Sequence, residues 1–134
     1  MLDTNVVSAA LRGHADLDDR LERLDPTAWC ISAITRAELR YGLALKPAAL
    51  RLAELVDAFL QAAVVASWDA AAADAHGSLR AELKRRGTPI GAYDEMIGAH
   101  ALALDAVLVT DNVQHFERIP GLRWENWLRQ TSGH

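Results

Sequence analysis

The strongest constraint on the fold of this chain is its alternation of very short apolar runs with longer stretches of helical periodicity. Short apolar runs bounded by turn residues are typical of buried strands, and they occupy residues 1–2, 29–31, 63–65 and 107–109. A fifth strand is expected at residues 122–124, where Leu122 and Trp124 flank Arg123. Helical stretches at residues 15–24, 34–45, 48–60, 69–86 and 94–104 separate them, and another helix follows Asp3. This order predicts an α/β sandwich, with helices flanking a central, mostly parallel sheet of about five short strands.

The helical stretches have the apolar spacing of helices that bury one face. Leu52 and Val56 lie four residues apart in one stretch, and Leu79 and Leu83 do so in another. Gly87 stands where a glycine ends a helix. With no internal repeat and no linker-like segment, the 134 residues predict one domain spanning residues 1–134.

Composition and charge narrow the location and the partners. The net charge of -4 argues against binding nucleic acid through overall charge, although a metal-binding carboxylate cluster would itself contribute negative charge. Cys30 is the single cysteine, so no intramolecular disulfide forms and a reducing compartment is favoured. No apolar run approaches the ~20 residues of a membrane span, and the N-terminus has no secretory signal. We therefore expect a cytoplasmic protein without a membrane partner.

Four acidic residues follow the predicted strands in a suggestive way. Asp3 ends the first strand, Glu38 lies on the helix after the second, Asp94 begins the helix before the fourth, and Asp111 follows that strand. In open parallel sheets, ligands bind in the crevice beyond the carboxyl ends of the strands. On this topology the four carboxylates can face one crevice.

Each acid alone also has a structural interpretation. Asp3 and Asp94 suit helix N-termini, and Asp111 suits a turn. Glu38 lies three residues after Thr35, which is the spacing of a capping box. The argument for function is therefore their joint placement.

Four converging carboxylates repel one another unless a cation offsets their charge. An acidic cluster without cysteine or histidine favours Mg²⁺, with Mn²⁺ as a substitute, over Zn²⁺. Such an ion activates water and stabilises charge on a phosphodiester. Asp3, Glu38, Asp94 and Asp111 are thus the candidate catalytic and metal-binding residues, and the candidate supporting residues are Thr4, Asn5, Thr110 and Asn112.

Other chemistries lack their sequence signals. The five histidines have no metal-binding spacing, and His100 on the helix after Asp94 is interpreted as a packing or helix-surface residue. There is no G-x-S-x-G elbow, no G-x-G-x-x-G loop and no Walker A loop, so no cofactor-binding residues are assigned.

Several motifs in order resemble those of one known family. They are Leu2-Asp3-Thr4-Asn5, the segment Thr35-Arg36-Ala37-Glu38-Leu39, the loop Gly87-Thr88-Pro89-Ile90-Gly91 before Asp94, and Val109-Thr110-Asp111-Asn112. The ordered set, which spans almost the whole chain, resembles the PIN-domain ribonucleases and, within them, the VapC toxins of toxin–antitoxin pairs.

The resemblance implies a metal site made of Asp3, Glu38, Asp94 and Asp111. Asp3 and Asp94 are expected to be direct ligands, and Glu38 and Asp111 are ligands or act through water. Family members often carry Asn where Asp111 stands, which makes Asp111 less essential than Asp3 or Asp94.

The resemblance also implies an activity and partners. The activity is a Mg²⁺-dependent endoribonuclease that cleaves tRNA or another structured translation RNA and leaves a 5′-phosphate. The partners are a VapB-type antitoxin that blocks the site, a second copy in a homodimer, and operator DNA bound only through the antitoxin. Two alternatives stay open: a catalytically silent PIN-like binding module, and a Mg²⁺-dependent aspartyl phosphatase, although Asn5 stands where that chemistry wants a second Asp.

Overall fold

A computed structural model describes residues 1–129 and 131–133. Its helices are α1 (Thr4–Leu11), α2 (Ala15–Arg23), α3 (Ala33–Ala44), α4 (Leu50–Ala62), α5 (Ala70–Arg86), α6 (Ala92–Ala103) and α7 (Val113–Phe116). Its strands are β1 (Ile31–Ser32), β2 (Val65–Ala66), β3 (Leu108–Val109), β4 (Trp124–Asn126) and β5 (Thr131–Gly133). The predicted α/β class is confirmed.

The sheet is built around a single residue, Leu2. β1 pairs in parallel with β2, β3 pairs in parallel with β4, and β5 closes the far edge antiparallel to β4. Leu2 bridges the two halves, because it pairs in parallel with both Ile31 and Val109. The resulting order is β2-β1-Leu2-β3-β4-β5, and the chain continues from Leu2, at the centre of the sheet, directly into Asp3.

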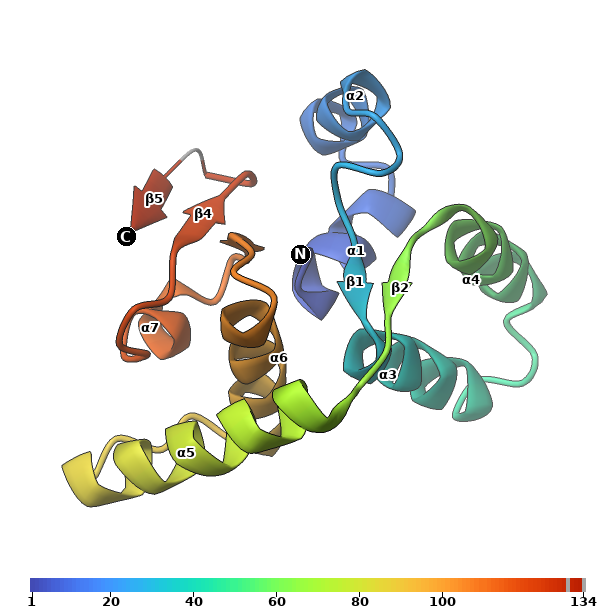
Figure 1. The fold of residues 1–134 in the computed structure, drawn as a ribbon. Coiled ribbons are helices and arrows are strands. Elements are labelled where there is room, and N and C mark those ends of the chain that lie inside the picture. Colours follow the sequence, from blue (N-terminus) through green and yellow to red (C-terminus); the bar gives the residue numbers. More distant parts are fainter. Residues whose placement is uncertain (130, 134) are drawn as a thin grey trace.

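Two apolar clusters hold the helices on this sheet. One includes Leu2, Val6 and Ile31 and packs α1, α3 and α4. The other is formed largely by α5, α6 and α7 and includes Ile97 and Phe116, both of which are fully buried. Helix α6 packs along α5 and lies between the β1–β2 half and the β4–β5 half of the molecule (Figure 1). Burial of this kind is the dominant stabilising contribution to a small domain.

Several helices and strands begin at other residues than predicted. The predicted strand at residues 1–2 is a single bridge at Leu2, and those at 29–31, 63–65 and 122–124 begin two residues later than predicted. Each strand begins at the first residue that pairs with a neighbouring strand. At β1 this residue is Ile31, because Leu2 pairs with Ile31 rather than with Trp29. The helix predicted at 94–104 begins at Ala92, after Gly91 with φ 97°, so Asp94 lies inside its first turn. β5 and α7 were not predicted from the sequence. Among the described residues, no helix has the length and apolarity to cross a membrane.

Candidate active site

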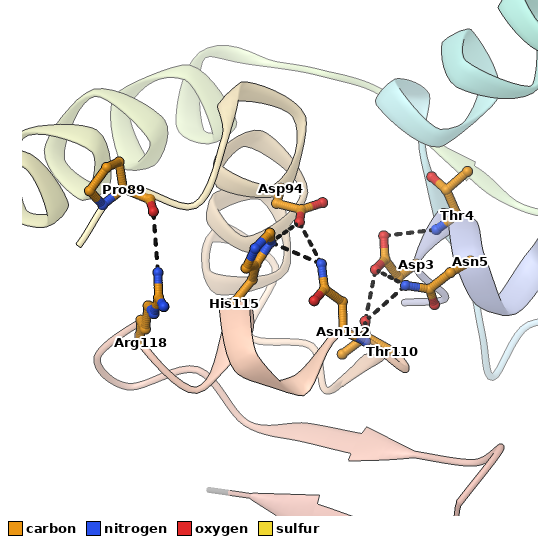
Figure 2. A network of polar contacts seen from close by, with 9 residues as sticks. All are labelled: Asp3, Thr4, Asn5, Pro89, Asp94, Thr110, Asn112, His115 and Arg118. Carbon is orange, nitrogen blue, oxygen red and sulfur yellow. Dashed lines mark hydrogen bonds and ion pairs between the residues drawn. The ribbon is translucent and has the colours of Figure 1, made fainter.

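The centre of the candidate site is Asp3, which is 2% exposed. The backbone N–H of Asp3 donates to the carbonyl oxygen of Val109 in the neighbouring strand. The Asp3 side chain is therefore held at the carboxyl end of the central strand position, next to Leu2. Oδ1 of Asp3 accepts a hydrogen bond from the Thr4 backbone N–H at 2.8 Å. Oδ2 accepts from the Thr110 hydroxyl at 2.8 Å and from the Asn5 amide at 3.1 Å (Figure 2). Asp3 is therefore the N-cap of α1, as its structural interpretation holds, and it also lies at the carboxyl end of the sheet.

Glu38 extends from α3 toward the start of α1, beside Asp3. Its Oε1 accepts from the Thr4 hydroxyl at 2.7 Å, and the Thr4 oxygen also lies 3.0 Å from the Thr35 hydroxyl. The capping-box interpretation of Glu38 is wrong, because α3 begins earlier, with Ser32 as its N-cap. Since Thr35 and Glu38 lie inside the helix, they are free to contact α1 instead.

Asp94 enters from the first turn of α6. Its Oδ2 accepts from the Asn112 amide at 2.9 Å and lies 2.6 Å from His115 Nδ1 (Figure 2). Asn112 follows β3 and His115 lies on α7. The Asp94 side chain is one-quarter exposed, so this carboxylate lies nearer to solvent than Asp3.

Asp3, Glu38 and Asp94 influence one another electrostatically. Burial raises the pKa of Asp3 to about 6, the negative charges of Asp94 and Glu38 push it in the same direction, and hydrogen bonds from Thr110 and Thr4 oppose the rise. Within residues 1–129, neither Asp3 nor Glu38 has an ion pair with a basic side chain. Asp3 and Glu38 thus lie together without a basic partner among the described residues, and Asp94 has His115 as its basic neighbour.

Asp111 lies at the edge of this group. Its backbone N–H donates to Asn5 Oδ1 at 3.1 Å, but its Oδ1 accepts from the Asn126 amide and from Arg129 Nε, each at 2.9 Å. Asp111 is also not among the charges that act on Asp3. Its carboxylate is held by Asn126 at the end of β4 and by Arg129 in the segment after it, away from the other three acids.

The four predicted supporting residues all lie in this network. Thr4, Asn5 and Thr110 bond Asp3 or Glu38, as described above. Asn112 bonds Asp94 through its side chain, and its backbone N–H donates to the Thr110 hydroxyl at 2.9 Å. Thr110 is fully buried, and its hydroxyl links Asp3 to Asn112 away from solvent.

The donor set fits a hard divalent cation. In the described part of the chain, no three side chains of the His, Cys, Asp and Glu types form by themselves a group that could hold a metal ion. The described hydrogen bonds to Glu38, Asp94 and Asp111, however, all end on one oxygen of each carboxylate and leave the other oxygen open. Mg²⁺ needs only one or two direct carboxylates and keeps several waters. An open arrangement of oxygen ligands is therefore compatible with it.

His115 is a site residue that the sequence analysis missed. The spacing of the five histidines matches no metal-binding motif. A spacing rule for metal ligands cannot detect a histidine that bonds a carboxylate from another element. The available signal was local: His115 follows Asn112 by three residues, which places both side chains on one side of a helical turn. His100, in contrast, is 1% exposed and contacts Ser32, as its packing interpretation holds.

Three comparisons relate this geometry to known proteins. The PIN domain family model matches residues 1–122. The tRNA(fMet)-specific endonuclease VapC of Salmonella typhimurium is 41% identical over 127 residues, covering 95% of this chain and 96% of that protein. The structure of DNA-bound VapBC from Salmonella typhimurium matches with TM-score 0.89 at 41% identity, over 95% of this chain and 96% of that one. VapBC2 from Rickettsia felis, bound to a DNA fragment from its promoter, matches with TM-score 0.87 at 36% identity, over 95% and 97%.

Proposed function

The chain belongs to the PIN-domain family and, within it, to the VapC group, and from this premise we propose that it is a metal-dependent endoribonuclease toxin. The observation that carries the proposal is the group of Asp3, Glu38 and Asp94 at the carboxyl end of the sheet, in which Asp3 and Glu38 have no basic partner among the described residues. Such a group favours a bound cation over three mutually repelling carboxylates. The proposed catalytic domain spans residues 1–134.

The proposed ion is Mg²⁺, with Mn²⁺ as a substitute. When bound, it supplies an activated water and stabilises the charge that develops on the attacked phosphodiester. Asp3 and Asp94 are the proposed direct ligands. Glu38, held by Thr4, completes the site directly or through water, and Asp111 acts from its edge.

The residues around the ligands fix their direction. Thr110 and Asn5 hold one oxygen of Asp3, and the Thr4 backbone holds the other. Because the central acid is buried and bonded on both oxygens, its orientation does not depend on the substrate. Preorganised groups of this kind need little rearrangement during reaction, which is how an active site lowers a barrier.

The proposed substrate is tRNA or another structured RNA of translation, since one relative is named for tRNA(fMet). The proposed protein partner is a VapB-type antitoxin, because the similar solved structures are VapBC complexes. Those two complexes hold DNA, and we propose that this chain meets operator DNA only through its antitoxin. A homodimer and a cytoplasmic location complete the proposal.

The test is cleavage of total tRNA and of a single-stranded RNA by the purified chain with Mg²⁺, with Mn²⁺ and with EDTA. Asp94→Asn removes a proposed ligand, and Asp74→Asn on the exposed surface of α5 is the matched control. Cleavage that is lost in EDTA and in Asp94→Asn, but retained in Asp74→Asn, would support the proposal. Cleavage that survives Asp94→Asn would contradict the assigned site. A folded chain that cuts no RNA would favour a catalytically silent binding module.

A further inference from the structure

One oxygen of Asp94 is bonded twice by residues that follow β3. His115 Nδ1 lies 2.6 Å from Oδ2, and the Asn112 amide lies 2.9 Å from the same atom (Figure 2). The contact between His115 and Asp94 joins α7 to α6 across 21 residues of sequence. It is the shortest of the described hydrogen bonds to the four acids.

The chemistry of this contact fixes the role of the imidazole. An ionised carboxylate has only acceptor oxygens, so the proton must lie on His115 Nδ1. The Asn112 amide, 2.9 Å from the same ring nitrogen, is then a second donor to Oδ2 and not a donor to the ring. Hydrogen bonds to an ionised group are shorter and stronger than neutral ones, as the 2.6 Å separation indicates.

Two donors on Oδ2 determine where the other oxygen points. An Asp side chain has two rotatable torsions, and fixing one carboxylate oxygen at two points fixes both of them. The free oxygen of Asp94 then faces the side of the site on which Asp3 lies (Figure 2). Without His115, Asn112 alone would hold Oδ2, and Asp94, on a partly exposed first helical turn, would reach other rotamers.

We propose that His115 is a positioning residue, which donates from Nδ1 to Asp94 and aims the other Asp94 oxygen at the metal site. The proposal rests on the proposed function, since the orientation matters only if Asp94 binds a cation. Partners that orient metal ligands change metal affinity or activity by roughly 10- to 100-fold when they are removed. His115 itself need not touch the metal or the RNA.

The test compares two amides that mimic different nitrogens of the ring. The Asn side chain places its N–H₂ where Nδ1 lies in His, whereas the Gln side chain reaches the place of Nε2. Mn²⁺ binding by calorimetry is measured for the wild type, His115→Ala, His115→Asn and His115→Gln, and RNA cleavage is followed in parallel. Gln114→Ala, on the exposed side of the same short helix, is the control.

We expect His115→Ala and His115→Gln to weaken Mn²⁺ binding by roughly 10- to 100-fold. His115→Asn should recover most of that loss, and Gln114→Ala should bind like the wild type. The thermal unfolding temperatures of the metal-free variants should not follow the order of their Mn²⁺ affinities. A role of His115 in folding alone would not distinguish His115→Asn from His115→Gln.

Two results would overturn the proposal while leaving the proposed function intact. One is wild-type affinity in His115→Ala, and the other is equal weakening by Ala, Asn and Gln. A wild-type chain that binds no Mn²⁺ and cuts no RNA would instead overturn both the positioning role and the proposed function.

Discussion

The Thr4 hydroxyl donates to Glu38 Oε1 at 2.7 Å and so joins the first residue of α1 to the middle of α3. This bond holds one carboxylate oxygen and directs the other, while the neighbouring backbone N–H of Thr4 bonds Asp3. A single residue therefore contacts two of the three grouped acids.

Thr4→Val removes this hydroxyl at nearly constant shape. We expect RNA cleavage to fall about tenfold, because Glu38 loses the donor that orients it. The free energy of unfolding should fall by only about 1 kcal/mol, the usual net contribution of one hydrogen bond. Thr4→Ser, which keeps the hydroxyl, should restore cleavage. If Ser and Val lowered cleavage equally, packing of the Thr4 methyl group would be the cause instead.

Asp111 should matter less than the other acids. Its carboxylate is bonded by Asn126 and Arg129 and lies outside the charges that act on Asp3. We expect Asp111→Asn to keep kcat/KM within about tenfold of the wild type, whereas Asp94→Asn loses on the order of 100-fold or more. Steady-state cleavage of one fluorogenic RNA would measure both variants. Equal losses would mean that Asp111 leaves Arg129 when the site is loaded.

The grouping of Asp3, Glu38 and Asp94 was predictable because it depends on topology. Asp3 follows the central strand position at Leu2, Glu38 lies on the helix after β1, and Asp94 lies at the start of the helix that leads into β3. The carboxyl ends of parallel strands meet at one edge of a sheet and the helices that connect such strands begin there, so the order of strands and helices is enough to predict this grouping. The catalytic role of these residues stays a prediction until it is measured.

Other parts of the site depend on contacts that no local pattern encodes. Arg129 meets Asp111, and His115 meets Asp94, only because β4 and α7 fold back beside the end of β3. The strand boundaries differ from the predicted ones for a similar reason. Leu2 pairs with Ile31, and both residues are fully buried in the assembled core. Tertiary contacts, rather than local propensity, set such details.

Ser32 joins the start of α3 to α6, the two helices that carry Glu38 and Asp94. Its hydroxyl caps α3 by accepting from the Ile34 N–H at 3.0 Å, and it lies 2.8 Å from Nδ1 of the buried His100. Ser32→Ala should lower the free energy of unfolding by about 1–3 kcal/mol, since a cap is lost and a buried ring nitrogen loses its partner. Urea unfolding would measure the change, with Ser32→Thr as the variant that keeps the hydroxyl. A loss below about 0.5 kcal/mol would contradict this role for Ser32.

The raised pKa of Asp3 makes stability depend on pH. Its ordinary value of 3.8 rises to about 6 in the folded chain, chiefly through burial, so between these values the folded state binds more protons than the unfolded state. The contribution of Asp3 to stability is therefore highest below about pH 4 and falls as pH rises through about 6. A rise of the Asp3 pKa from 3.8 to about 6 corresponds to roughly 3 kcal/mol in the free energy of unfolding.

Asp3→Asn removes this titration. We expect the variant to gain stability relative to the wild type as pH rises from about 4 to above 6, when both are unfolded in urea without metal. Comparing the difference at two pH values cancels the hydrogen bonds that Asn changes at both. Mg²⁺ added above pH 6 should stabilise the wild type much more than Asp3→Asn, because a cation that binds only the folded site offsets the buried charge. A pH-independent difference would mean that the charge of Asp3 is already compensated in the free protein, and Asp3 would then offer no driving force for binding a metal.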